Sequence, residues 1–125
     1  MEKKVSVRTH KDLEIWKLGI DLVDLVYSVT GCFPKDEVYG LTAQMRRAAV
    51  SIPSNISEGA ARNSKKEFIQ FLYIGLASLA ELETQIVIAE RLKYIRSPEL
   101  PLLVDKLRPK IISFIKYMKS PKKPL

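Results

Sequence analysis

The sequence predicts an all-α protein, an up-down antiparallel four-helix bundle built as one domain over residues 1–125. Apolar residues recur at helical spacing through four successive segments, and none of these segments shows the strict alternation of a half-buried strand. Capping and turn signals separate the segments by short loops, which favours antiparallel neighbours. The expected helices are 10–30, 37–60, 65–96 and 98–118, followed by a basic tail, 119–125.

Local signals bound the first expected helix, 10–30. Thr9 followed by Asp12 has the spacing of a capping box, in which side chains satisfy the free amides of a first helical turn. Gly31 and the following Pro34 are typical of a helix end, because glycine accepts the capping conformation and proline cannot continue the helix.

Two apolar stripes run along this helix on nearly opposite faces. The stripe expected to face the bundle core comprises Leu13, Trp16, Ile20, Val23 and Tyr27. The second stripe comprises Ile15, Leu18, Leu22, Leu25 and Val29. Because a peripheral helix needs one stripe for its core, we expect the second to form an oligomer interface through Ile15, Leu18, Leu22 and Leu25. The alternative is that the helix packs against two neighbours in its own chain.

The second expected helix, 37–60, begins after Asp36, which can cap it, and contains Pro53. Proline lacks the amide that would bond to the carbonyl of Ala49, so we expect a helix that is bent there but continuous. Small polar side chains surround the bend and are expected to bond to the freed carbonyl: Ser51, Ser54, Asn55 and Ser57.

The last two helices also carry start signals. Ser64 and Glu67 form a capping box at the start of the helix 65–96. Ser97 is expected to cap the helix 98–118, with Pro98 at its first position, where a missing amide costs little.

Positive charge is concentrated at the C-terminal end of a chain whose formal net charge is +7. Residues 106–125 contain no acidic residue, which favours a polyanionic partner such as RNA or DNA. Their seven basic residues are Lys106, Arg108, Lys110, Lys116, Lys119, Lys122 and Lys123. The alternative is that these side chains keep the protein soluble and complement a helix C-terminus.

Arg46 and Arg47 are a second candidate site, able to hold phosphates or the carboxylates of a partner protein. The alternative is ion pairing within the protein. The candidate pairs are Arg47 or Arg62 with Glu58, and Arg46 with Glu81 or Glu83.

Residues typical of catalysis and metal binding are scarce. His10 is the only histidine and Cys32 the only cysteine, so we expect no metal site, no cofactor and no catalytic residues. A hydrolase or nuclease would lack both a metal site and a base. The longest uncharged stretch, Phe68–Ala80, is too short to span a bilayer. We therefore expect a cytoplasmic protein without a membrane partner.

One stretch of the chain resembles a known family. Phe33–Leu41 (FPKDEVYGL), Gln44–Gly59 (QMRRAAVSIPSNISEG) and the continuation Phe68–Glu83 resemble the 23S rRNA intervening-sequence proteins, over roughly residues 12–96. That name refers to reading frames within insertions of bacterial 23S rRNA genes. The resemblance implies a bacterial four-helix bundle that assembles into a ring-like pentamer. It extends to the accessory proteins of diversity-generating retroelements, which are associated with nucleic acid and a reverse transcriptase.

Together these observations predict a non-enzymatic, oligomeric binding protein. Its expected partners are further copies of itself and structured RNA or DNA, held by Arg46, Arg47 and the C-terminal basic residues. The alternative is a structural or protein-binding oligomer in which the arginines close helix contacts and the lysines only solubilise the protein.

Overall fold

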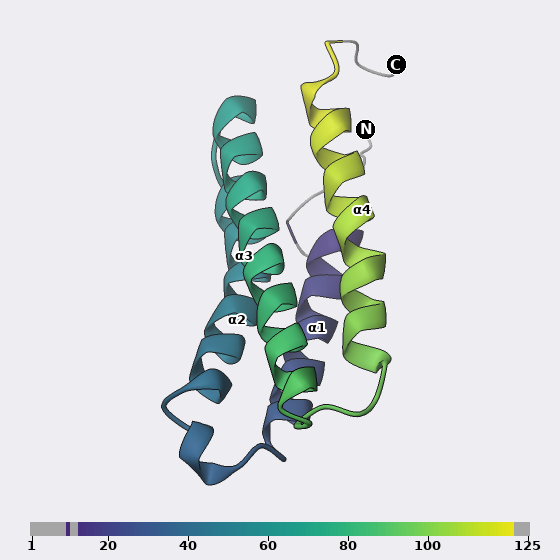
Figure 1. Ribbon diagram of the computed structural model, residues 1–125. Coiled ribbons are helices and arrows are strands. Elements are labelled where there is room, and N and C mark those ends of the chain that lie inside the picture. Colours follow the sequence, from purple (N-terminus) through teal and green to yellow (C-terminus); the bar gives the residue numbers. More distant parts are fainter. Residues whose placement is uncertain (1–9, 11–12, 122–125) are drawn as a thin grey trace.

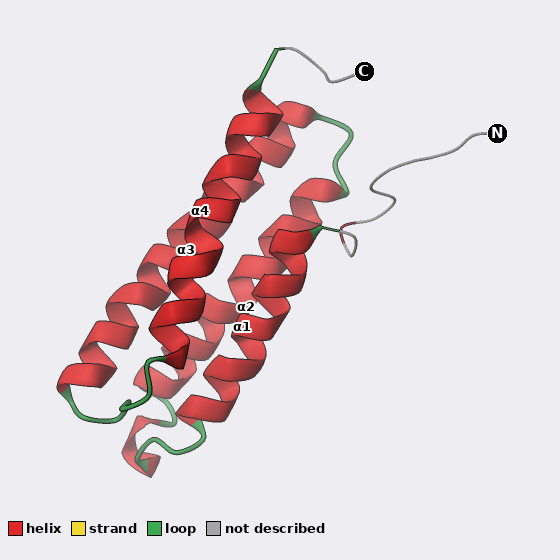
Figure 2. Cartoon of the chain, turned by 90° about the vertical axis from the view of Figure 1, so that its right-hand side faces the viewer, coloured by secondary structure: helices red, strands yellow, loops and turns green. Residues whose placement is uncertain are grey.

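The computed structural model describes residue 10 and residues 13–121, and within them the chain forms four α-helices and no strand (Figure 1). The helices are α1 (Glu14–Thr30), α2 (Leu41–Ala60), α3 (Lys65–Arg91) and α4 (Glu99–Lys119), with a short 3₁₀ helix η2 (Lys35–Glu37) before α2. The axes of the four α-helices are roughly aligned with one another (Figure 2). The expected all-α four-helix bundle is confirmed.

Each helix packs against its neighbours in sequence, and α4 also packs against α1, which closes the bundle. The backbones of the diagonal pairs, α1 with α3 and α2 with α4, lie farther apart, with no Cα atoms within 8 Å of each other. The space between them is filled by apolar side chains from every helix, including the fully buried Leu22, Met45, Leu79 and Leu107. Burial of such side chains is the main stabilising contribution of the core.

The roles expected for the two stripes of α1 are wrong. Ile15, Leu18 and Leu22 lie in the core of the same chain, and Leu22 is 0% exposed, so these side chains are not available to another subunit. Leu25 is half-buried against that core. In the other stripe only Leu13 is buried, whereas Trp16, Ile20 and Val23 are half-buried and Tyr27 is exposed. Both stripes are apolar, and only the positions of α2 and α4 decide which one faces inward.

The start of α1 and the end of α3 differ from the expectation. α1 begins at Glu14 and not near residue 10; Leu13 is its N-cap, and the proposed cap Thr9 lies outside the described residues. α3 ends at Arg91 and not near residue 96, because Lys93 adopts a left-handed backbone with φ of 65°. The amide of Tyr94 then bonds to the carbonyl of Ala89 at 2.9 Å, which closes a Schellman-type end.

Glu37, and not the expected Asp36, caps α2. One oxygen of the Glu37 carboxylate accepts a hydrogen bond from the Leu41 amide at 3.0 Å. The other accepts from the Tyr94 hydroxyl at 3.0 Å. Glu37 therefore joins the start of α2 to the end of α3. It is the last residue of η2, and the turn at residues 38–40 separates it from α2, which begins at Leu41 and not at residue 37.

The helix α2 is continuous through Pro53, as expected. The side-chain bonds near the proline go elsewhere than predicted: Asn55 Nδ2 donates to the Ser51 carbonyl at 2.8 Å, and Ser57 donates to the Ser54 carbonyl at 3.0 Å. Among the described residues no side chain donates to the Ala49 carbonyl. Asn55 also donates to Ser51 Oγ, so this polar group stabilises the local turn of α2.

The start of α3 is confirmed, because the Ser64 hydroxyl accepts from the Glu67 amide at 3.2 Å. At the start of α4 the Ser97 hydroxyl accepts from the Glu99 amide at 3.3 Å, although Pro98 is the N-cap residue. α4 continues one residue beyond the expected 118 to Lys119, so Lys119 belongs to the helix and not to the tail.

Candidate functional sites

The described basic residues of the C-terminal region lie on the two edges of α4. Lys106 and Lys110 line a hollow of about 640 Å³ between α4 and the start of α1. Lys116 and Lys119 line a smaller hollow of about 170 Å³ between α4 and α3. The exposed face of α4 therefore carries cations along both of its borders, and Lys122 and Lys123 lie outside the described residues.

Three of these basic residues already have partners in the protein. Arg108 forms ion pairs with Glu83 of α3 and with Asp105. Lys110 lies 3.4 Å from the Glu14 carboxylate. The Lys119 ammonium donates to the Tyr73 hydroxyl at 2.8 Å. Lys106 and Lys116 are exposed and form no ion pair within the described part of the chain, so they are the free cations of α4.

Arg46 stabilises the end of α1. Its Nε donates to Thr30 Oγ1 at 2.8 Å, its Nη2 lies 3.4 Å from the Tyr27 carbonyl, and its guanidinium stacks 4.4 Å from the centre of the Tyr27 ring. A cation at the C-terminal end of a helix also interacts favourably with the helix dipole. The alternative that Arg46 pairs with Glu81 or Glu83 is wrong, since its described partners belong to α1 and not to α3.

Arg47, the next residue, is exposed and makes no hydrogen bond or ion pair with any described residue. It lines an open groove of about 590 Å³ bounded by the end of α1, by η2 and by the first half of α2. Arg47 lies on α2, which is diagonal to α4 in the bundle, so Arg47 and the lysines of α4 do not lie on two adjacent helices. The structure thus separates the predicted basic residues into two surfaces.

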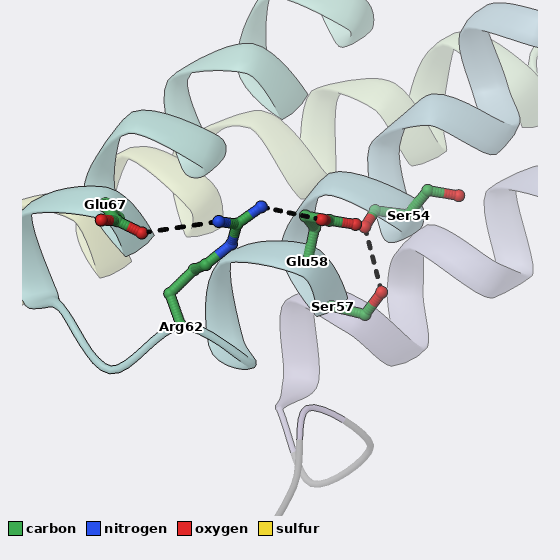
Figure 3. A network of polar contacts seen from close by, with 5 residues as sticks. All are labelled: Ser54, Ser57, Glu58, Arg62 and Glu67. Carbon is green, nitrogen blue, oxygen red and sulfur yellow. Dashed lines mark hydrogen bonds and ion pairs between the residues drawn. The ribbon is translucent and has the colours of Figure 1, made fainter.

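Arg62 forms the ion pair with Glu58 that the sequence analysis gave as an alternative to ligand binding. Figure 3 shows its guanidinium between two carboxylates, Glu58 of α2 at 2.9 Å and Glu67 of α3 at 3.7 Å. The same guanidinium lies 4.8 Å from the centre of the Phe71 ring. Arg62 therefore links α2 to α3 across their connecting turn. Because its guanidinium is already paired with carboxylates, its role is structural.

The outer side of α3 is unusually apolar. Its exposed large apolar side chains are Tyr73, Ile74, Val87 and Ile88. Exposed Ala77, Ala80 and Thr84 lie between them, and Glu81 is the one exposed charged residue between Tyr73 and Ile88. By length and composition α3 could cross a membrane, with a mean hydropathy of 1.4 over its most apolar window, of which 33% is buried. The sequence showed the uncharged run but not which part of it faces outward.

Candidate metal ligands are few in the described residues, and one tyrosine there has a shifted pKa. No group of three or more histidine, cysteine, aspartate or glutamate residues could hold a metal ion there. Cys32 is exposed, and His10 packs edge-on against Trp16. The pKa of Tyr94 is raised above its ordinary value of 10.0, first by the hydrogen bond to Glu37, then by desolvation and by the charges of Glu37 and Asp36.

Comparison with known proteins identifies the family of this chain. No curated protein matches the chain. A family model described as 23S rRNA-intervening sequence protein matches residues 11–113, which include every helix except the last turns of α4. The match also includes the groove beside Arg47 and the region from Phe33 to Glu83 that resembles the family in sequence. The chain belongs to the 23S rRNA-intervening sequence protein family.

Proposed function

We propose that this protein is a non-enzymatic helical-bundle protein that binds the backbone of RNA or DNA through α4. The observation that carries the proposal is the distribution of charge on this helix: from Lys106 onward α4 holds five basic residues and no acidic one. Cations on both borders of an exposed helix face can contact successive phosphates. The description of the family, which names 23S rRNA, is compatible with an RNA partner.

The partners of the α4 cations are compatible with this proposal. The pair between Lys110 and Glu14 lies at the surface, with 38% and 67% of the two side chains exposed. Surface pairs of this kind contribute about 0–1 kcal/mol, so a phosphate can replace the carboxylate at little cost. Arg108 is the exception, because Glu83 holds it against α3 and Asp105 of α4 is a second carboxylate partner.

A charge-reversal experiment tests the proposal. Fluorescence anisotropy with an RNA hairpin and a DNA duplex at about 50 mM salt should show binding at micromolar protein, because phosphate contacts are strongest at low salt. The double variant Lys106→Glu/Lys116→Glu should bind at least about tenfold more weakly to both ligands, with no preference for sequence.

The matched control is Arg91→Glu/Arg96→Glu. Both residues are exposed, neither has a partner among the described residues, and the net charge changes by the same amount. Equal loss in both double variants would show a general effect of net charge, and absence of binding by the unaltered protein would reject the proposal.

The outer face of α3 supports a second candidate function, a structural or protein-binding oligomer. Four exposed large apolar side chains on one helix, Tyr73, Ile74, Val87 and Ile88, are typical of a surface that another subunit covers. Light scattering coupled to size exclusion tests this candidate. The protein should elute as an oligomer that Ile74→Glu/Ile88→Glu converts to a folded monomer, whereas a monomer at tens of micromolar rejects it.

A further inference from the structure

The groove beside Arg47 combines apolar walls with positive charge. Of the exposed large apolar side chains of the protein, three line this one groove: Tyr27, Val38 and Val50, each at least 40% exposed. They come from α1, from the turn after η2 and from α2. Side chains from three separate elements thus leave apolar surface uncovered at one place, which is typical of an interaction site.

Every charged residue that lines the groove is basic. These residues are Lys35, Arg46 and Arg47, and no acidic residue lines it. Arg46 is held by α1, but Arg47 has no partner among the described residues, and a free guanidinium can bind a carboxylate through two parallel hydrogen bonds. Charge complementarity therefore selects an acidic occupant.

Thr42 adds an unpaired polar group to the same groove. Its side chain is only 6% exposed and lines the same groove, yet its hydroxyl makes no hydrogen bond with any described residue. A polar backbone or side-chain atom of an occupant can therefore bond to this hydroxyl.

We propose that this groove binds a short acidic segment of another protein, in which aspartate or glutamate stands beside aliphatic or aromatic residues. The apolar residues of the segment pack on Val38 and Val50, its carboxylate binds Arg47, and a polar backbone group reaches Thr42. A nucleic-acid backbone fits less well, because the exposed Val38 and Val50 form part of the walls and the Arg46 guanidinium already stacks on the Tyr27 ring. The proposal is independent of the function proposed for α4.

Selection from a phage-displayed library of random peptides tests the proposal with the intact protein. Enriched peptides should combine acidic and apolar residues, and a synthetic peptide of the enriched sequence should bind by fluorescence anisotropy. Arg47→Glu should weaken this binding at least about tenfold, since it replaces an attraction by a repulsion. Val50→Asp should do the same by removing an apolar wall. Lys66→Glu, exposed at the start of α3, is the charge-matched control and should bind normally.

Amide chemical shifts of the unaltered protein locate the bound peptide. This measurement does not depend on the variants, so it tests the proposal even if one of them folds poorly. Peptide should shift the signals of Val38, Thr42 and Arg47 and leave those of Lys106 and Lys116 unchanged. The proposal is overturned if no acidic and apolar motif is enriched, or if Arg47→Glu binds the peptide as well as the unaltered protein. It is also overturned if Arg47→Glu instead dissociates a self-assembled oligomer, or abolishes binding of a single-stranded RNA that shifts the same groove signals.

Discussion

Gly59 of α2 lies so close to Phe68 of α3 that a Cβ atom at residue 59 would stand 2.8 Å from Phe68 Cδ1. The same Cβ would lie 2.8 Å from Phe71 Cβ and 3.2 Å from the Phe68 carbonyl oxygen. Backbone and Cβ atoms cannot move aside as the end of a flexible side chain can. The absence of a side chain at Gly59 is therefore what lets α2 and α3 approach each other near their connecting turn.

Gly59→Ala should lower the free energy of unfolding by about 1–3 kcal/mol, because overpacking forces the helices apart. Gly19→Ala is the control within α1. A Cβ at residue 19 would meet the Pro53 ring at 3.4 Å, an ordinary contact, so the gain in helix propensity of up to about 1 kcal/mol should offset its cost. Urea unfolding of both variants checks the contrast; equal stability of the two would contradict it.

Arg46→Met should destabilise the protein by about 1 kcal/mol, since it removes two charge-assisted contacts to the end of α1 at a partly exposed site. Arg47→Met should change stability by less than about 0.5 kcal/mol, because Arg47 has no partner in the described part of the chain. Thermal unfolding monitored by circular dichroism distinguishes the adjacent positions. A larger loss for Arg47→Met would refute the assignment of their roles.

Lys93→Gly should raise the free energy of unfolding by about 0.5–1 kcal/mol, because glycine adopts the left-handed conformation at the end of α3 without steric cost. The substitution should leave the far-ultraviolet spectrum unchanged. As a control, Arg91→Gly inside the last turn of α3 should instead destabilise by about 1 kcal/mol or less. Loss of stability in Lys93→Gly would contradict the helix end described above.

The hydrogen bond between Tyr94 and Glu37 should make stability depend on alkaline pH. The pKa of Tyr94 is raised in the folded protein, mainly by this bond, so its contribution is fully present below the ordinary value of 10.0. That contribution is lost as the pH rises through the higher pKa of the folded state. Tyr94→Phe should therefore be less stable near neutral pH and approach the unaltered protein in strongly alkaline solution. A constant difference across this range would exclude the linkage.

Local signals in the sequence were sufficient for most of the fold. Four apolar segments, the glycine after α1 and the serine before α3 gave the number of helices and two of their ends. The end of α3 could not be predicted from the sequence, because Lys93 adopts a left-handed conformation that a lysine does not favour. Only the surrounding contacts stabilise this conformation. The start of α2 was misplaced because Glu37 lies in η2, where its carboxylate accepts hydrogen bonds from the distant Tyr94 hydroxyl and from the first amide of α2.

The sites were less predictable than the helices, because they depend on neighbours that periodicity does not reveal. Leu22 and Ile20 are equally apolar, yet the first is completely buried and the second only half-buried. Arg46 and Arg47 are adjacent and chemically identical, and both line the groove, but only Arg46 bonds to α1, whereas Arg47 has no partner among the described residues. The groove itself could not be inferred, since Tyr27, Val38 and Val50 meet only after three elements have folded together.

The salt dependence of nucleic-acid binding tests the central proposal for α4 most directly. For duplex DNA the logarithm of the affinity should fall linearly with the logarithm of salt concentration, by about 0.9 for each phosphate contact. Removing the free cations in Lys106→Glu/Lys116→Glu should make the slope shallower by about two units, one for each lost contact. Binding that is insensitive to salt, or a slope that this double variant leaves unchanged, would contradict the assignment of α4 as the nucleic-acid interface.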